Sequence, residues 1–385
     1  MTVLFWACAA YVLYVYALFP LLVLVRGRVA RRPYRRGSIT PSVSVLIAAR
    51  NEEAAIGGRI ENLLGLDYPA DRLDVVIASD GSDDRTNEVV SGCESDRVTL
   101  LALERVGKPE ALNAAAAAAT GDVLVFSDAN SVFRADAVRQ LVSPLADPDV
   151  GGVAGNQIYL PPDAGDASVV GEQQYWDLDR ALKRAESDAG SVSGATGAIY
   201  AVRRSLFTRL RRDVSNDDLL ESLGVVAQGS RLVFEPDAIA FEHVAETTRV
   251  TFERRVRVMV GGFRCLWVMR RLLNPLRHGF FAIQLLTRKV LLRTMVIPLV
   301  AISVLTPLLW TQGLVYRLAA VAEFEFYILA VLGVLLRDRP TGKMRILALP
   351  AYFCLINLAS GKALLQMARG ERYERWEPAR PDGTK

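Results

Sequence analysis

The chain has 385 residues, a formal net charge of +4 and a hydrophobic content of 51%, which is enough for one soluble domain together with membrane segments. Its four cysteines are scattered without paired spacing, and it has only two histidines. This composition argues against a disulfide framework and against a zinc site. Chemistry in this chain must therefore depend on carboxylates, lysine and arginine.

The first 25 residues are expected to form a transmembrane helix. Thr2 to Val25 contains no charged residue, and at about 1.5 Å per helical residue it can cross a bilayer core of roughly 30 Å. Six arginines follow between Arg26 and Arg36, and an excess of positive charge marks the cytoplasmic flank of a span. A secretory signal peptide is the alternative, but the apolar run is long and its positive charges come after it.

An α/β domain is predicted over residues 39–250, because short apolar runs alternate there with helical stretches. Strands are expected at Val43–Ala49, Leu73–Ser79, Val98–Leu103 and Asp122–Asp128, and helices at Glu53–Leu66, Thr86–Gly92 and Lys108–Thr120. This alternation indicates a parallel sheet covered by helices. In such a sheet, ligands bind beyond the carboxyl ends of the strands.

Polar clusters follow three of the predicted strands at the point where each strand ends. They are Arg50–Glu52, Asp80–Asp84 and the segment from Asp128 to Asn130. Such residues also form turns and helix caps, which would explain any one cluster alone. Three clusters at equivalent positions instead favour a single site. Asp128 and Asn130 would offer that site oxygen ligands, which Mg²⁺ and Mn²⁺ prefer alongside substrate phosphates.

Residues 251–289 are predicted to form amphipathic helices at the membrane interface. Apolar side chains at helical spacing share one face, namely Phe252, Val256, Met259, Phe263 and Leu266. Arginines lie toward the other face, at Arg254, Arg257, Arg264 and Arg271. A basic amphipathic helix beside membrane spans commonly lies in the interface, so the apolar face is expected in lipid.

The C-terminal third is apolar again, and residues 290–368 are predicted to hold further transmembrane helices. The candidates are Val290–Trp310, Leu318–Leu336 and Ile346–Met367. The last of these contains Asn357, Ser360, Gly361 and Lys362, so both a span and an interfacial helix stay open for it. Residues 369–385 are predicted to be a cytoplasmic or interfacial tail.

Seven segments, taken in order, resemble glycosyltransferase family 2. They are "LIAARNEEAAI", "IASDGSDDRT", "GKPEALNAA", "VFSDANS", "GATGAIYAVRR", "SNDDLLESLGVVAQGSRLVFEPDAIAFE" and "FERRVRV". The resemblance covers roughly residues 41–271. The apolar flanks are similar to those of bacterial membrane-embedded polysaccharide synthases of the cellulose, hyaluronan and poly-N-acetylglucosamine type. The resemblance to glycosyltransferase family 2 implies a GT-A fold, which is Rossmann-like with a mixed, mainly parallel sheet.

The resemblance implies a nucleotide-diphosphate sugar donor, with UDP expected, and a Mg²⁺ or Mn²⁺ ion. The donor-binding residues that it implies are Ala49, Asn51, Glu52, Asp80, Lys108, Asn113, Asp128, Arg254 and Arg257. Asp80 would accept the uracil N–H. Asp128 would hold the metal with Asn130, which stands where relatives have a second aspartate. Lys108 also fits a solvated charge at the start of a helix.

The resemblance further implies an inverting displacement with Asp218 as general base. "NDD" (Asn216–Asp218) matches the family's Thr-Glu-Asp motif, and one carboxylate near the acceptor hydroxyl can take its proton while the metal stabilises the departing diphosphate. Alternatively, Asp217 and Asp218 cap the helix Leu219–Gln228. The acceptor-binding residues implied are Gly194, Ala195, Thr196, Gly197 and Asp217. Arg254 and Arg257 match the Q/R-x-x-R-W motif, but Val258 replaces its tryptophan, which leaves the acceptor open.

These inferences predict a multi-pass protein of the inner (plasma) membrane whose cytoplasmic domain extends a β-linked polysaccharide. Two alternatives stay open, a single-addition glycosyltransferase acting on a lipid acceptor and a nucleotide-sugar-binding partner subunit without activity. The expected partners are a UDP-sugar, a glycan or lipid-linked acceptor and membrane lipid, with no nucleic acid. The sequence does not identify the sugar, the linkage or any partner subunit.

Overall fold

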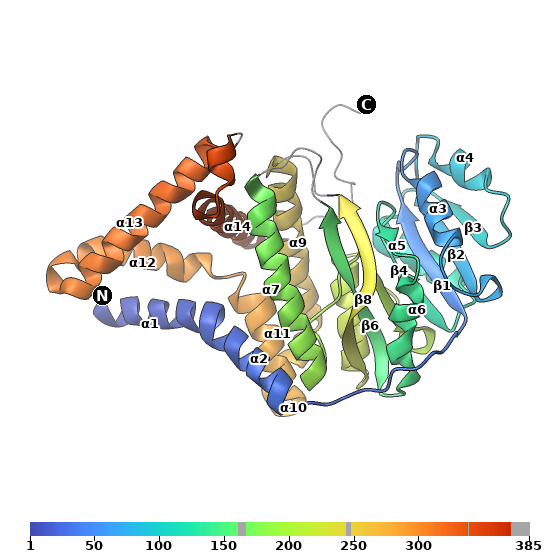
Figure 1. Ribbon diagram of the computed structural model, residues 1–385, viewed down its shortest axis with the longest axis horizontal. Coiled ribbons are helices and arrows are strands. Elements are labelled where there is room, and N and C mark those ends of the chain that lie inside the picture. Colours follow the sequence, from blue (N-terminus) through green and yellow to red (C-terminus); the bar gives the residue numbers. More distant parts are fainter. Residues whose placement is uncertain (161–166, 244–247, 338, 371–385) are drawn as a thin grey trace.

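The computed structural model describes residues 1–385 apart from 161–166, 244–247, 338 and 371–385. Figure 1 shows an α/β domain on one side and a group of long helices on the other, with α7, α9 and α11 between them. The predicted tail, residues 369–385, lies outside the described residues except for Arg369 and Gly370.

A mixed sheet forms the centre of the α/β domain. Its eight strands in the described residues are, in spatial order, β3 (Val98–Leu103), β2 (Leu73–Asp80), β1 (Val43–Ala49), β4 (Val123–Phe126), β7 (Tyr200–Arg203), β6 (Val150–Leu160), β8 (Arg231–His243) and β5 (Val132–Phe133). The first four are mutually parallel, and β7 is antiparallel to both neighbours. Strands β6 and β8 are parallel to each other and therefore run in the direction of β4. The expected mixed, mainly parallel sheet is confirmed.

Helices cover both faces of the sheet, and this explains why its strands are apolar on both sides. One face carries α3 (Ile56–Leu64), α4 (Thr86–Ser91) and α6 (Ala137–Val142), and the other carries α5 (Lys108–Ala118), α8 (Asp217–Ala227) and the end of α9 (Thr248–Val268). Along β1, Val45 faces the first core and Leu46 the second, and both are fully buried. Such two-sided burial is typical of parallel sheets.

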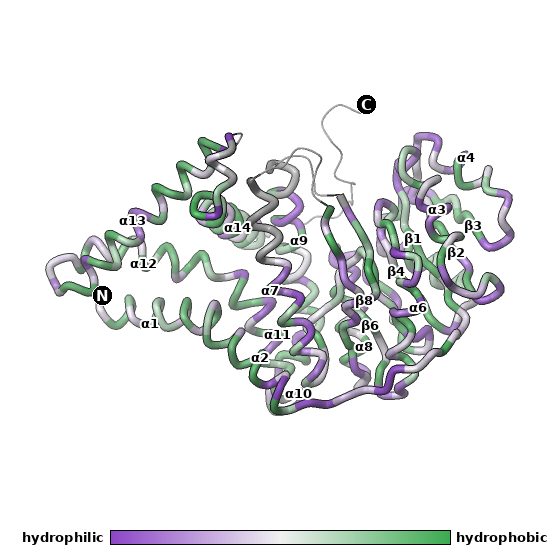
Figure 2. Tube along the Cα trace, viewed as in Figure 1, coloured by the Kyte–Doolittle hydropathy of each residue, from purple (hydrophilic) through white to green (hydrophobic). Residues whose placement is uncertain are grey.

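Three helices are long and apolar enough to cross a membrane in the described residues. They are Thr2–Val29, α13 (Leu314–Leu335) and α14 (Arg345–Ala368). The first combines α1 (Thr2–Leu13), a π-helical turn (Tyr14–Leu18) and α2 (Phe19–Val29). Figure 2 shows how apolar residues gather along these helices and α12, in contrast to the α/β domain. Residues 346–367, for which two readings were open, thus belong to a helix of spanning length.

The single helix expected over Val290–Trp310 is wrong. Helix α11 (Phe280–Leu286) continues as a π-helical turn (Thr287–Leu291), and the chain bends by 60° before α12 (Val296–Leu308). A continuous helix would need the backbone N–H of Pro298 to bond the carbonyl of Thr294, and proline has no N–H. Because α12 has 13 residues, it is about 20 Å long, which is shorter than a bilayer core. The bent pair can form a broken span or a re-entrant segment.

The expectation that α9 turns its apolar face to lipid is also wrong. Val256 and Val260 are buried against Ala359 and Ala363 of α14. Farther along, Leu266 enters the core of the α/β domain. The small alanine side chains of α14 allow the two helices to approach closely, so protein covers this face in place of lipid. Helix α9 therefore connects the α/β domain to the group of long helices.

Candidate active site

The loops that follow β1 and β2 brace each other at the carboxyl edge of the sheet. Arg50 donates a hydrogen bond to the carbonyl of Asp80 at 2.9 Å. The side-chain oxygen of Asn51 accepts from the backbone N–H of Asp83 at 2.9 Å, and the N–H of Glu52 donates to Thr86 Oγ1 at 2.7 Å. Asn51 has a φ of 53°, a left-handed conformation that asparagine tolerates better than most residues. The two predicted clusters therefore form one rigid rim.

Asp80, at the end of β2, fixes the start of α5. Its Oδ1 accepts the backbone N–H groups of Val106 at 2.6 Å and Gly107 at 2.8 Å. Gly107 has a φ of 91°, where a residue with a Cβ would be strained. The chain can therefore turn sharply, and Lys108 becomes the first residue of α5. The role of Asp80 toward a uracil base stays a prediction.

Lys108 joins the end of β4 to the start of α8. Its Nζ lies 2.8 Å from Asp128 Oδ1 and 3.3 Å from Asp217 Oδ2. Burial by itself lowers the pKa of Lys108, but Asp128 and Asp217 outweigh burial and raise it, so the ammonium stays charged. Its side chain is only 15% exposed, which excludes the alternative of a solvated charge at a helix start.

The same cation keeps Asp128 ionised. Burial raises the pKa of this carboxyl, but Lys108 opposes the effect, and Arg254 and Arg257 of α9 add to the opposition, so the pKa is lowered overall. The two arginines predicted to act on the donor thus lie close enough to Asp128 to influence its charge. Asp128, which follows β4, therefore lies among charged side chains of α5, α8 and α9.

Asp218 lies in an environment that suits a general base. It and Asp217 are the first two residues of α8, whose N-cap position is occupied by Asn216. Burial, together with the neighbouring charge of Asp217, raises the pKa of Asp218 to about 6, while Lys108 opposes the rise. A carboxyl that titrates near neutral pH can both accept and release a proton. The two aspartates follow the N-cap position, but Asp218 Oδ1 accepts the backbone N–H of Leu219 at 2.7 Å, so the capping alternative holds in part for Asp218.

The segment from Gly194 to Gly197 lies against these carboxylates. A Cβ placed on Gly197 would lie 3.1 Å from Asp128 Oδ2, and one on Gly194 would lie 2.8 Å from Leu219 of α8 and 3.5 Å from Lys289 Nζ. The backbone N–H of Ala195 donates to Ser222 of α8 at 3.3 Å. Glycine thus permits a close approach of backbone at both ends of the segment. Lys289, from the turn after α11, is a nearby cation that sequence reasoning did not single out.

Comparisons with known proteins agree with this geometry. Residues 44–211 match the model of the family described as "Glycosyl transferase family 2". These residues form a family 2 glycosyltransferase domain. The chain is 28% identical over 233 residues to poly-beta-1,6-N-acetyl-D-glucosamine synthase of Staphylococcus aureus (strain COL), covering 58% of this chain and 55% of the relative. It is also 28% identical to the probable glycosyltransferase YdaM of Bacillus subtilis (strain 168), covering 56% and 54%.

The chain therefore spans about half the length of the curated relatives that it matches. A similar solved structure is the mannosyltransferase PcManGT from Pyrobaculum calidifontis, determined in complex with GDP-Man and Mn²⁺. Its TM-score is 0.68 at 25% identity, and the similarity covers 94% of this chain and 99% of that one. The resemblance to family 2 and the GT-A-like architecture are confirmed.

Glu242 lies next to this group of charged residues, and the sequence analysis did not single it out. It lies near the end of β8, is 2% exposed, and accepts hydrogen bonds from Ser131 at 2.7 Å and from Gln157. A terminal nitrogen of Arg254 lies 3.9 Å from it. Burial and the nearby Asp128 raise the pKa of Glu242. The sequence places Glu242 near the end of the run that forms β8, but no local pattern shows that this end lies beside Asp128.

Two predicted donor-binding residues, Asn113 and Ala49, and the predicted metal ligand Asn130 have placements that the sequence did not foresee. Both amide atoms of Asn113 bond the backbone of Leu210, at 2.9 and 2.8 Å, so this side chain braces a loop. Ala49 is fully buried at the end of β1. Asn130 is exposed in the turn that follows Asp128, where its amide can reach a ligand.

The side chains of this site fit a divalent metal ion only if substrate phosphates supply the remaining ligands. No group of three or more His, Cys, Asp or Glu that could hold a metal occurs among the described residues. Asp128 and Asn130 offer hard oxygen ligands, and Mg²⁺ is commonly held by one or two carboxylates together with substrate phosphates. The residues therefore fit an ion bound jointly with a diphosphate, and not one that the protein holds alone.

Proposed function

We propose that this chain is an inverting membrane glycosyltransferase that transfers a sugar from a nucleotide-diphosphate donor to a growing β-linked polysaccharide. The observation that carries the proposal is the group formed by Lys108, Asp128, Asp217 and Asp218 at the carboxyl edge of the sheet. It combines an ionised carboxylate beside a cation with a second carboxylate whose pKa is about 6. The family 2 domain supports glycosyl transfer as the reaction.

In the proposed mechanism, Asp218 accepts the proton of the acceptor hydroxyl as that oxygen attacks the anomeric carbon. The bond to the diphosphate oxygen breaks on the opposite side of the same carbon, which inverts its configuration. A positioned general base of this kind is worth about 10²–10⁴-fold in rate. The wall formed by Gly194–Gly197 would seat the acceptor next to Asp218, because it lies against α8.

The departing diphosphate would be stabilised by charges on the other side of the site. A Mg²⁺ or Mn²⁺ ion held by Asp128 and Asn130 would supply positive charge at the leaving oxygens. Arg254 and Arg257 would add paired donors, which match phosphate oxygens better than the point charge of a lysine. The Mn²⁺ in the PcManGT complex supports the choice of a divalent metal. Lys108 keeps Asp128 ionised and ready to bind it.

We assign UDP as the donor nucleotide, with Asp80 at the base. A polysaccharide product is supported by the similarity to the staphylococcal poly-beta-1,6-N-acetyl-D-glucosamine synthase. GDP-mannose is the competing donor, because PcManGT was solved with GDP-Man and is similar over 94% of this chain. The donor nucleotide is therefore a part of the proposal that an experiment must test first.

We place the protein in the plasma membrane as a multi-pass protein, with the catalytic domain in the cytoplasm. Three helices of spanning length and the bent pair α11–α12 support several crossings. The basic residues that follow α2 support a cytoplasmic position for the domain. Membrane lipid is then a partner of the chain, because the spanning helices contact it.

A single-addition transferase acting on a lipid acceptor is the second candidate. Val258, which stands in place of the motif's tryptophan, is 39% exposed on α9 and presents no aromatic face to a sugar. A synthase that holds a long glycan needs such a face more than an enzyme that adds one sugar to a lipid. The two candidates share the same catalytic group and differ in the product.

Both are tested by product analysis with the full chain purified in detergent. A panel of UDP- and GDP-sugars is supplied with Mg²⁺ or Mn²⁺, and products are separated by length and by solubility in organic solvent. We expect a polymer from a UDP-sugar. A single lipid-linked sugar would favour the second candidate. Absence of transfer from every donor, in protein that binds UDP or GDP, would overturn both.

A further inference from the structure

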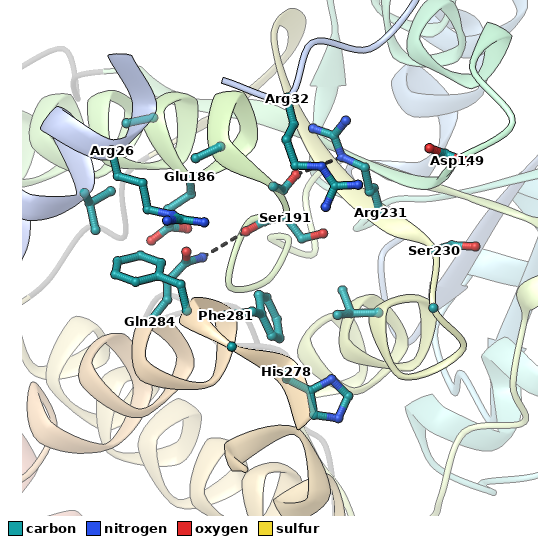
Figure 3. A pocket seen from close by; sticks show the side chains of 18 of the residues that line it. Arg26, Arg32, Asp149, Glu186, Ser191, Ser230, Arg231, His278, Phe281 and Gln284 are labelled. Carbon is teal, nitrogen blue, oxygen red and sulfur yellow. Dashed lines mark hydrogen bonds between the residues drawn. The ribbon is translucent and has the colours of Figure 1, made fainter. Parts of the chain in front are cut away.

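A cavity of about 580 Å³ lies at the opposite edge of the sheet from the catalytic group (Figure 3). It is bounded by the end of α2, the end of α7 (Ala167–Ala189), the start of β8, and the turn between α10 (Pro275–His278) and α11. Arg231 is the first residue of β8, and Glu242 of the catalytic site is near its end. At about 3.3 Å per strand residue, the 11 steps from Arg231 to Glu242 span up to roughly 36 Å. The cavity is thus separate from the proposed active site.

The polar wall of this cavity is basic. Four arginines line it, and they are Arg26, Arg32, Arg231 and Arg277. Figure 3 shows the side chains of Arg32 and Arg231 next to each other, with Arg26 across the cavity. None of the four forms an ion pair with a carboxylate of the described residues. Their positive charge is therefore left for a ligand to neutralise.

The cavity wall also contains two carboxylates, Glu186 and Asp149, which do not neutralise the four arginines. Glu186 accepts hydrogen bonds from the backbone and side chain of Ser193, and Arg288 lies 3.2 Å from it. Arg288 belongs to the turn after α11 and does not line the cavity. Asp149 is then the one remaining acidic side chain in the lining, against four guanidinium groups. The cavity has a net positive charge.

The arginines repel one another in the absence of an anion. Burial lowers the pKa of Arg231 and the charge of Arg32 lowers it further, while Tyr34, Asp147 and Asp149 oppose this shift without reversing it. Arg231 is held in place by donating to the carbonyls of Gly190 and Ser187, at 3.1 and 3.0 Å. An anion placed between Arg231 and Arg32 would remove this repulsion, and guanidinium groups bind phosphate oxygens through paired donors.

Part of the remaining wall is apolar, and one side of it belongs to the end of the first long helix. Val23 of α2 is 2% exposed and packs with Ala185 of α7. Arg26 lies over the ring of Phe280, 4.5 Å from its centroid. Helices α2 and α7 touch closely, because a Cβ on Gly27 would lie 2.7 Å from that of Ala185. The basic wall therefore begins where the apolar helix ends.

We propose that this cavity binds the phosphate-bearing headgroup of an anionic phospholipid from the leaflet that faces the α/β domain. A phosphate group is the shared chemistry of lipid headgroups and soluble phosphates. The apolar wall favours the lipid, because the outward side of the same helix exposes Leu21, Leu22 and Val25 at 59%, 46% and 47%. Basic pockets at the cytoplasmic ends of membrane helices commonly hold such headgroups.

A bound headgroup would connect the membrane to the sheet. Arg26 belongs to the membrane helix and Arg231 to the core strand β8, so a headgroup that reaches across the cavity from Arg231 and Arg32 to Arg26 joins the two parts of the molecule. The inference rests on the membrane placement proposed above, and it does not depend on glycosyl transfer. Binding can therefore be measured whether or not the catalytic proposal holds.

The test compares two double variants of the full chain in neutral detergent. Arg32→Gln with Arg277→Gln removes two exposed arginines of the cavity. Arg31→Gln with Arg271→Gln removes two exposed arginines that do not line it, and it changes the net charge equally. Binding of phosphatidylglycerol is measured by native mass spectrometry, with phosphatidylcholine and inorganic phosphate as comparison ligands.

We expect the cavity variant to bind phosphatidylglycerol about 25-fold more weakly, from about fivefold for each arginine. The matched variant should stay within about twofold of the unmodified chain. Equal losses in both variants, or equal binding of phosphatidylcholine, would overturn the site. Inorganic phosphate that binds as tightly as the lipid would overturn the lipid as its source. If the double variant is not monodisperse, Arg277→Gln alone provides the same comparison against Arg271→Gln.

Discussion

The two edges of the sheet carry opposite arrangements of charge. At the carboxyl edge, Lys108 lies between Asp128 and Asp217, so each buried carboxylate has a cation within 3.3 Å. At the other edge, Arg32 and Arg231 face each other without a carboxylate partner among the described residues. The first edge is stabilised by its own residues and is prepared for a reaction. The second edge needs a ligand to balance its charge.

This contrast means that removing a cation should cost much more stability at the carboxyl edge than at the opposite edge. Removal of Lys108 leaves two carboxylates without their cation, which costs free energy. Removal of Arg32 relieves repulsion and costs little in the ligand-free protein.

Removal of the divalent metal should abolish sugar transfer. The oxygens of Asp128 and Asn130 cannot neutralise the negative charge of a leaving diphosphate, and the ion that they would hold supplies the positive charge. Transfer is measured before and after treatment with EDTA, and again after Mg²⁺ or Mn²⁺ is restored. Full turnover in the presence of chelator would rule out the metal assignment at the carboxyl edge.

Asp218→Asn should lower the transfer rate by about 10²–10⁴-fold, which is the usual contribution of a positioned base. Donor binding should persist, because the substitution nearly keeps the shape of the side chain. Nucleotide binding is measured by calorimetry and transfer by product formation. Asp213→Asn is a control on the same loop, since Asp213 pairs with Arg211 and Arg264 outside the site. Near-normal transfer in Asp218→Asn would move the base elsewhere, with Asp217 examined first.

Lys108→Met should destabilise the fold by about 3 kcal/mol, because removing one partner of a buried ion pair leaves an uncompensated charge. The measurement is thermal unfolding of the purified chain in detergent. A matched control is Lys362→Met, whose partner Glu253 is exposed, so its effect should be below about 1 kcal/mol. If both variants unfold at the same temperature, the cation between the two aspartates does not contribute as described.

Arg32→Gln should leave the unfolding temperature in neutral detergent nearly unchanged, within about 0.5 kcal/mol, as for most surface substitutions. Its side chain is exposed, and the substitution removes a like charge from beside Arg231. The adjacent Arg31→Gln is the control. A clear loss of stability without lipid would show that Arg32 has an essential partner within the protein, which contradicts the charge imbalance of the second edge.

The sequence predicted the carboxyl edge better than any other part of the molecule. Strands β1 and β3 have the predicted bounds. For β1 the reason is that a buried parallel strand forms a continuous apolar run, which here ends sharply at polar residues. Polar clusters at those ends identified Asp80, Asp128 and the loop after β1. Glu242 escaped because its place beside Asp128 depends on β8 pairing with β6, which no local pattern predicts.

The errors of the sequence analysis concern what covers a helix and where a helix breaks. Periodicity identified the amphipathic character of α9, but lipid and another helix are equally apolar, so the pattern could not show that Ala359 and Ala363 bury Val256. Hydropathy likewise predicted an unbroken helix through Val290–Trp310. The signal that argued against it was Pro298, whose effect on the preceding turn hydropathy alone does not register. The basic cavity draws on α2, β8 and α10, and only the tertiary structure brings these together.

The pH dependence of sugar transfer tests the central claim most directly, because it reports on the group proposed as the base. Burial and Asp217 raise the pKa of Asp218 to about 6, and a base must be deprotonated to act. The value of kcat/KM at fixed metal concentration should therefore fall about tenfold per pH unit below pH 6 and level off above it. Asp218→Asn should lose this dependence along with most of its activity. A rate in the unmodified chain that is constant from about pH 5 to 8 would contradict Asp218 as the general base.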